Sequence, residues 1–301
     1  MSARHFLSLR DLSPEELGNI IQRAIELKAL QKSGALHEPL RNKMLALVFD
    51  KSSTRTRVSF ETGMTQLGGN SMFLSPRDTQ LGRGEPIKDT ARVLGRMVQG
   101  TVFRTFAQSD VEEFARYAQI PTINALTDHE HPCQILADIF TFQEKRGPIR
   151  GKVVTFIGDG VGNVATSLAF ASGKAGFELR LAAPKAFQPS ADLLKRAGGK
   201  IVLTEDVQAA ATGADLLYTD VWVSMGREAD SDRRNQQMSG YQINAAVVRL
   251  ANPGALVMHC LPAYRGKEID EETFEANAQT IFDQSENRLH VQKAILAWLV
   301  R

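Results

Sequence analysis

The sequence is poor in cysteine: its 301 residues include only Cys133 and Cys260, which lie far apart. Two distant thiols do not make a disulfide framework of the kind that stabilises small secreted domains. The first residues, Met1–His5, also lack the apolar core of a signal peptide. We therefore expect a protein of a reducing compartment, the cytoplasm by default, that is stable without disulfides.

An excess of either charge is missing as well. The 36 lysines and arginines are balanced by 34 acidic residues, which leaves a net charge of +2. Such a balance provides no extended basic surface, so we expect neither nucleic acid nor a membrane as a partner. The longest clean apolar run, 294–300, is too short to span a bilayer. Any anion must therefore be bound by a local group of side chains.

Short apolar segments typical of strands alternate with segments of helical periodicity along the chain, whose length indicates about two domains. We expect strands at 44–49, 70–74, 101–105, 121–125, 152–157, 179–183, 200–203, 215–219 and 255–259. This alternation predicts parallel sheets covered by helices. The predicted fold class is α/β, with two doubly wound parallel-sheet domains joined by interdomain helices.

The stretch Ser53-Thr54-Arg55-Thr56-Arg57 lies between the first predicted strand and a predicted helix. A helix N-terminus has unpaired N–H groups and a partial positive charge, which suit an anion. The hydroxyls add donors, and Arg55 adds a planar guanidinium that matches phosphate or carboxylate oxygens. A plain N-cap with solvated arginines is the alternative. Two arginines that alternate with threonines at the end of a strand favour an oxyanion site.

The run His131-Pro132-Cys133-Gln134 begins another predicted helix, with proline in its first turn. One interpretation is a metal site that uses His129, His131 and Cys133. A second is that His131 only caps the helix. In the third, His131 donates to a developing oxyanion and Gln134, one turn further on, holds an amide.

The glycine-rich turn Gly158–Asn163 follows the most strongly predicted strand and suggests a dinucleotide loop. The last glycine position of that fingerprint is occupied by Asn163, however, and the next strand ends at 182–185 without an acid for a ribose hydroxyl. A tight turn that only serves helix packing is the other interpretation. We expect no nicotinamide cofactor, and a dehydrogenase remains an alternative.

Polar residues also follow the later predicted strands. Asp220 is either an acid for a substrate ammonium or part of an exposed loop, and Cys260 is either a site residue or a packing residue. Arg288, which we place just before the last helix, is either solvated or directed toward a site. Ligands of open α/β sheets bind beyond the carboxyl ends of strands. Since Arg104 and Asn163 also occupy such ends, we favour the functional interpretations.

In their order and spacing these motifs resemble the ornithine carbamoyltransferases of the aspartate/ornithine carbamoyltransferase family, over essentially the whole chain. The Ser224-Met225-Gly226 and His259-Cys260-Leu261-Pro262 runs are similar to the ornithine branch. The resemblance implies transfer of the carbamoyl group of carbamoyl phosphate to the Nδ amine of ornithine, giving citrulline and phosphate without a metal or organic cofactor. This reaction serves either arginine biosynthesis or, in reverse, arginine catabolism. A related acceptor (acetylornithine, putrescine or aspartate) and a non-catalytic sensor of these ligands are alternatives.

The resemblance also implies roles for matched residues. Those for carbamoyl phosphate are Ser53, Thr54, Arg55, Thr56, Gln80, Arg104, His131, Gln134, Cys260, Leu261 and Arg288. Gln80 would act from a neighbouring subunit, because these enzymes are built from trimers with shared sites. Those for ornithine are Asn163, Asp220, Ser224 and Met225, and the catalytic set is Arg55, Arg104, His131, Asp220 and Cys260. Gly162 replaces an asparagine frequent in the family, which bears on the shape of the ornithine pocket.

The expected domains follow from the same comparison. We predict a carbamoyl phosphate-binding domain over 1–130 and an ornithine-binding domain over 131–285. A C-terminal helix over 286–301 is expected to pack back on the first domain.

Overall fold

The structure is a computed structural model that describes residues 3–75, 77, 79–224 and 230–300. Internal contacts divide the chain into two units, residues 1–140 with 286–301 and residues 141–285. Both boundaries fall inside helices, α5 (Pro132–Arg146) and α12 (Ala278–Leu299). These two helices therefore join the units, as the predicted fold class requires.

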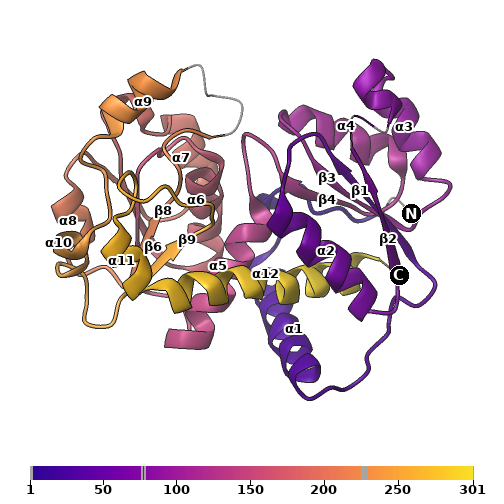
Figure 1. The fold of residues 1–301 in the computed structure, drawn as a ribbon, viewed down its shortest axis with the longest axis horizontal. Coiled ribbons are helices and arrows are strands. Elements are labelled where there is room, and N and C mark those ends of the chain that lie inside the picture. Colours follow the sequence, from indigo (N-terminus) through magenta and orange to yellow (C-terminus); the bar gives the residue numbers. More distant parts are fainter. Residues whose placement is uncertain (1–2, 76, 78, 225–229, 301) are drawn as a thin grey trace. The chain divides into compact units, whose positions relative to one another are not determined.

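The first unit is built on a parallel sheet of four strands in the order β2-β1-β3-β4 (Figure 1). Its strands are β1 (Met44–Phe49), β2 (Asn70–Leu74), β3 (Gly100–Arg104) and β4 (Thr122–Leu126). Its helical segments are η1 (Leu9–Asp11), α1 (Pro14–Lys32), α2 (Thr54–Gln66), η2 (Gln80–Arg83), α3 (Ile87–Leu94) and α4 (Gln108–Ala118). β1 is a continuous apolar run because a central parallel strand is buried on both faces.

The second unit has a parallel sheet of five strands in the order β7-β6-β5-β8-β9 (Figure 1). Its strands are β5 (Val153–Ile157), β6 (Glu178–Ala182), β7 (Ile201–Thr204), β8 (Leu216–Thr219) and β9 (Leu256–His259). Its helical segments are α6 (Asn163–Ala175), η3 (Lys185–Phe187), α7 (Ala191–Ala197), α8 (Val207–Ala211), α9 (Ser231–Met238), α10 (Ala245–Val248) and α11 (Glu271–Ala276).

Each sheet has one point at which the order of the strands reverses. In the first, the chain runs from β1 outward to β2 and then crosses to β3 on the other side of β1. In the second, it runs from β5 through β6 to β7 and returns to β8 beside β5. Ligands of such sheets bind at this switch point, beyond the carboxyl ends of the two flanking strands. The turns after β1, β3, β5 and β8 are therefore where the chemistry is expected.

All nine predicted strands are present, each within one residue of its expected ends. Two helix predictions were wrong at one end. The sequence is helical in pattern over 87–98, which predicts a helix of that length, but α3 stops at Leu94; α12 begins ten residues before Arg288 instead of just after it. The buried face of α12 carries Gln284, Asn287 and Arg288 as well as apolar residues, so hydrophobic periodicity does not reveal its first half. Within the described residues no helix has the length and apolar character that crossing a membrane requires.

Candidate active site

The first group of site residues lies where β1 ends and α2 begins. Ser53 is the N-cap of α2, and its hydroxyl accepts a hydrogen bond from the backbone N–H of Thr56 at 3.2 Å. The cap interpretation of this residue is thus correct, and it leaves the hydroxyl hydrogen available for another acceptor. Thr56 is fully buried, Arg55 is half-buried and Thr54 is exposed. The turn presents hydroxyls and helix N–H groups together, which is the chemistry of an anion site.

Two buried arginines reach this turn from other elements. Arg104 ends β3, is 4% exposed and pairs in register with Phe49 of β1. Arg288 comes from the middle of α12, is 2% exposed and donates from Nη2 to Oγ1 of Thr56. A buried guanidinium is stable only with anionic or hydrogen-bonding partners. Two of them beside a helix N-terminus therefore favour an anionic ligand.

His131 lies among these guanidiniums. Burial lowers the pKa of its imidazole well below the usual value, and Arg288, Arg104 and Arg55 lower it further, in that order. The imidazole is therefore neutral at physiological pH and has a single N–H to donate. A neutral donor surrounded by fixed positive charge stabilises an oxygen that gains negative charge during a reaction.

Gln134 follows His131 by one turn of α5 and is 1% exposed. Its Nε2 donates to Oδ1 of Asp138 at 2.9 Å, whereas its Oε1 has no hydrogen-bond partner among the described residues. A buried carbonyl oxygen without a donor is costly, so this atom is suited to accept from the NH₂ group of a ligand.

The structure does not favour the metal site that uses Cys133. The thiol of Cys133 donates to the carbonyl of Asn124 at 3.4 Å, and burial raises its pKa to about 12. A metal requires the thiolate, which this environment opposes. Gln80 has a different setting from the other predicted residues, because it lies exposed at the start of η2.

Two buried charged residues near His131 were missed by the sequence analysis. Glu130 accepts hydrogen bonds from the Ser8 hydroxyl at 2.6 Å and the Leu9 N–H at 3.0 Å, and burial raises its pKa to about 7. Lys51 is 5% exposed and pairs with Asp128. Both contacts fix the loop that leads to His131. Their partners lie 77 or more residues away in the sequence, so no local pattern identifies them.

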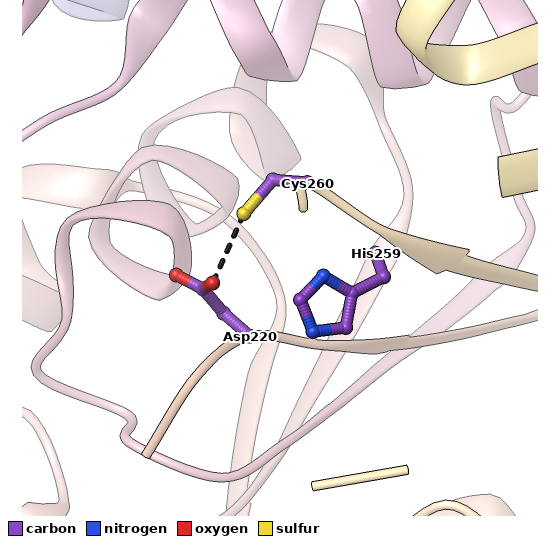
Figure 2. A group of neighbouring side chains, drawn as sticks. All are labelled: Asp220, His259 and Cys260. Carbon is purple, nitrogen blue, oxygen red and sulfur yellow. Dashed lines mark hydrogen bonds between the residues drawn. The ribbon is translucent and has the colours of Figure 1, made fainter. Parts of the chain in front are cut away.

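The second group of site residues lies at the ends of β8 and β9. The thiol of Cys260 donates to Oδ1 of Asp220 at 3.0 Å, and the imidazole of His259 lies beside them (Figure 2). The N–H of Leu261 donates to Nδ1 of His259 at 2.9 Å, so Nδ1 is an acceptor and the ring proton is on Nε2. Nε2 is 3.2 Å from a buried carboxylate oxygen of Glu268, which fixes this tautomer.

The environment of Asp220 favours its protonated form more than water does. Burial raises the pKa of this carboxyl, and the negative charge of Glu268 raises it further. The His259 ring and the hydrogen bond from Cys260 act in the opposite direction. A carboxylate with a raised pKa beside a thiol is a better proton acceptor than an ordinary aspartate.

These three side chains are also the one group in the described part of the chain with the spacing of a metal site. One ligand atom from each of Asp220, His259 and Cys260 lies within 4.8 Å of the other two, and oxygen, nitrogen and sulfur are ligands that zinc accepts. Both ring nitrogens of His259 already make hydrogen bonds, to Leu261 and Glu268. A metal bound here would have to replace one of them.

The other residues predicted for the second substrate lie near the same sheet edge. Asn163 is the first residue of α6, after β5, and Ser224 lies in the segment after β8; both are half-buried. Met225 lies outside the described residues. Gly160, in the glycine-rich turn after β5, is required for packing. A Cβ at this position would lie 2.8 Å from the carbonyl oxygen of Phe187.

Arg234 is a further residue that the sequence analysis missed. It is 3% exposed, pairs with the buried carboxylate of Asp159, and donates from Nε to the carbonyl of Trp222 at 2.9 Å. It thus ties the segment after β8 to the glycine-rich turn after β5. Its position in a run of charged residues is typical of a solvated helix, which concealed this role.

The chain is similar to known proteins along almost its whole length. The carbamoyl-P binding domain of aspartate/ornithine carbamoyltransferase matches residues 4–144, and its Asp/Orn binding domain matches residues 150–299. The ornithine carbamoyltransferase of Methylococcus capsulatus is 53% identical over 300 residues, covering 100% of this chain and 99% of that protein. The anabolic ornithine carbamoyltransferase of Pseudomonas aeruginosa is 51% identical over 300 residues, covering 100% and 98%.

Solved structures agree with these matches. The ornithine carbamoyltransferase from Pyrococcus furiosus superposes with a TM-score of 0.94 at 44% identity, covering 99% of this chain and 97% of that one. The anabolic enzyme from Campylobacter jejuni gives a TM-score of 0.92 at 43% identity, covering 98% of each chain. The chain belongs to the aspartate/ornithine carbamoyltransferase family.

Proposed function

We propose that this protein transfers the carbamoyl group of carbamoyl phosphate to the Nδ amine of L-ornithine, giving L-citrulline and phosphate, as a step of arginine biosynthesis. The observation that carries the proposal is the neutral, buried His131, with the guanidiniums of Arg288, Arg104 and Arg55 near it. The acceptor is taken from relatives about half identical over the full chain, which are named ornithine carbamoyltransferases.

Carbamoyl phosphate is assigned to the first unit. Its phosphate would accept from the N-terminal N–H groups of α2, from the hydroxyls of Ser53, Thr54 and Thr56, and from Arg55. His131 and Arg104 would donate to the carbamoyl oxygen, and Gln134 would accept from the carbamoyl amide. One well-placed donor to a developing oxyanion lowers the activation free energy by about 3 kcal/mol. Together these residues would polarise the carbonyl carbon and hold the leaving group.

Ornithine is assigned to the second unit, with Asn163, Ser224 and Met225 as binding residues. Its Nδ amine has an ordinary pKa of about 10.4, so only about one molecule in 10³ carries a neutral amine at pH 7, a handicap of about 4–5 kcal/mol. Asp220 would accept this proton, and the thiol of Cys260, which donates to Asp220, would face the amine. The N–C bond then forms, the C–O bond to phosphate breaks, and phosphate leaves as an anion paired with Arg55.

Three further assignments belong to the same proposal. The protein is a homotrimer or a multiple of trimers, in which Gln80 of one subunit completes the carbamoyl phosphate site of its neighbour. It is cytoplasmic. Residues 1–130 bind carbamoyl phosphate, residues 131–285 bind ornithine, and residues 286–301 belong to a helix that packs on the first domain.

The test is a colorimetric citrulline assay with ornithine, putrescine, aspartate and acetylornithine compared as acceptors. Ornithine should give the highest kcat/KM, and Arg55→Gly should abolish turnover with an unchanged circular dichroism spectrum. Arg57→Gly is the matched control, because Arg57 is exposed on the same helix and pairs with Glu61. An active Arg55→Gly enzyme, or a higher kcat/KM with another acceptor, contradicts the proposal.

A further inference from the structure

The first unit has a pocket that contains none of the residues assigned above. Its volume is about 260 Å³. It is lined by Leu27, Leu30, Gln31, Gly34, Ala35, Leu36, His37, Glu38, Thr65, Gln66, Leu67 and Lys293. These residues come from α1, the segment after it, the end of α2, and α12. The pocket thus combines four leucines with polar groups that centre on one lysine.

Lys293 is 3% exposed, and its position depends on a glycine. A Cβ on Gly63 of α2 would lie only 3.1 Å from Cγ of Lys293, so the missing side chain gives the lysine stem room to pass. Its Nζ donates to Oε1 of Gln31 at 3.1 Å and to Oε1 of Gln66 at 2.9 Å. Both acceptors are neutral amides, and no described carboxylate lies within 4 Å of this Nζ.

The groups on the α1 side of Lys293 do not supply a negative charge to it. Nη2 of Arg23 lies 2.7 Å from Nε2 of His37. Because arginine only donates, this nitrogen accepts and the ring carries its proton on Nδ1, so His37 is neutral. Burial and the charges of Arg23 and Lys293 all lower the pKa of His37. Glu26 is already paired with Arg23 at 2.8 Å.

The remaining charged groups near Lys293 are engaged elsewhere or exposed. On α12, Glu286 lies 3.3 Å from Nε2 of His290 and 3.9 Å from Nζ of Lys28. Glu38 lines the pocket but is exposed to water, which screens its charge. A buried ammonium held only by neutral acceptors is destabilised by desolvation and gains from an anion.

The apolar part of the pocket indicates which anion. The buried Leu27 and Leu67 and the half-buried Leu30 form its walls, and Leu36 at its edge is 83% exposed. Ligand pockets typically combine apolar walls with a few polar groups that fix orientation. We propose that this pocket binds a small aliphatic carboxylate, whose anion pairs with the Lys293 ammonium and whose chain packs on Leu30 and Leu36.

The protonation of Lys293 gives the proposal a measurable signature. Burial lowers the pKa of this amine to about 8. A carboxylate binds the protonated form, so it raises the pKa and takes up a proton from solution above pH 8. The protonated fraction is about 90% at pH 7 and about 3% at pH 9.5, so the affinity should decrease about 30-fold between these pH values.

The experiment is isothermal titration of the full-length protein with isovalerate, acetate and inorganic phosphate at pH 7 and pH 9.5. Isovalerate should bind best and lose about 30-fold in affinity at the higher pH. Lys293→Met should abolish binding, and Lys32→Met, which changes an exposed lysine of α1, should not. Absence of isovalerate binding at pH 7, equal binding by Lys293→Met, or a preference for phosphate would overturn the proposal.

A second variant tests the proposal even if Lys293→Met does not fold. Leu36→Ser changes a side chain that is 83% exposed, and it should weaken isovalerate without changing acetate. Equal losses for the two ligands contradict the assignment of the leucines. Citrulline formation by Lys293→Met and Leu36→Ser should match that of the unmodified protein, so this proposal and the proposed function fail separately.

Discussion

The chemical character of His131 is set by residues that are remote from it in the sequence. Burial has the largest effect on its pKa, followed by Arg288, Arg104 and Arg55. A solvated histidine would be partly protonated at neutral pH and would bind an anion as a cation. Here the positive charge belongs to the guanidiniums, and the imidazole is left as a neutral hydrogen-bond donor. In the proposed mechanism Arg55 and the start of α2 would bind the phosphate, whereas the neutral His131 would polarise the carbonyl together with Arg104.

Glu130, directly before His131, yields a prediction at the residue scale. Burial raises its pKa from 4.5 to about 7, so the folded protein holds this proton over a range in which the unfolded chain has released it. Stability from this group is therefore present at low pH and is lost as the pH rises through the folded pKa. Between pH 5 and pH 8 the loss should be about 2–3 kcal/mol.

The measurement is urea denaturation of the protein and of Glu130→Gln at both pH values. Glutamine cannot ionise, so the difference in unfolding free energy between pH 5 and pH 8 should shift by about 2–3 kcal/mol in the variant. Glu112→Gln provides the control, because Glu112 is exposed on α4. Identical pH dependence in Glu130→Gln and the unmodified protein would show that Glu130 does not carry this proton.

At the scale of elements, two helical glycines are expected to respond in opposite directions to alanine. Gly18 lies within α1, and a Cβ there would meet nothing within 4 Å. Gly95 ends α3, and a Cβ there would lie 2.0 Å from the carbonyl oxygen of Ala118. Gly18→Ala should stabilise by about 0.5–1 kcal/mol, because alanine loses less backbone entropy in a helix. Gly95→Ala should destabilise by about 1–3 kcal/mol, because backbone must move.

Thermal unfolding of the two variants checks this pair, and each is the control for the other. Equal shifts of Tm in the same direction would contradict this prediction. They would mean that the backbone at Ala118 moves away from a Cβ at position 95 without loss of stability. Gly18 lies on α1, which carries none of the assigned site residues, so citrulline formation at 25 °C should be unchanged in Gly18→Ala.

The elements that could be predicted from the sequence are those with a continuous local signal. A central strand such as β1 is apolar at every position, and Ser13 with Pro14 and Glu16 shows the start of α1, where the capping box is formed. The first half of α12 was missed because Gln284 and Asn287 occupy buried positions. The missed helix start and the candidate site have the same cause. The buried polar residues that interrupt the apolar periodicity lie beside Arg288, which donates to Thr56.

The parts of the site that depend on distant partners could not be predicted. Ser53 and His131 were identifiable because they stand at helix starts after strands. Arg234 and Glu268 were not, since a buried arginine in a charged run and a buried glutamate after a turn have no distinctive spacing. Their roles follow only from packing, which brings Arg234 to Asp159 and Glu268 to His259.

At the scale of the whole molecule, the role proposed for Gln80 makes a prediction about subunits. Gln80 is exposed on η2, unlike the buried Arg104, His131 and Gln134. In the trimer proposed above, a neighbouring subunit would cover this exposed residue and bring it to the neighbour's site. If Gln80 acts only on the neighbour's carbamoyl phosphate, each site takes its Arg55 from one chain and its Gln80 from the next. Arg55→Gly and Gln80→Ala then inactivate a site through different chains.

Mixed trimers of the two variants should therefore regain activity that neither variant has alone. After unfolding and refolding in equal amounts, random assembly gives about a quarter of the sites an intact Arg55 from one chain and an intact Gln80 from the next. Citrulline formation should rise to about a quarter of the activity of the unmodified protein treated in the same way. Refolding each variant by itself is the control. If the mixture stays inactive although size-exclusion chromatography shows trimers, Gln80 acts within its own chain or not at all, and the shared site must be abandoned while the chemistry at His131 stands.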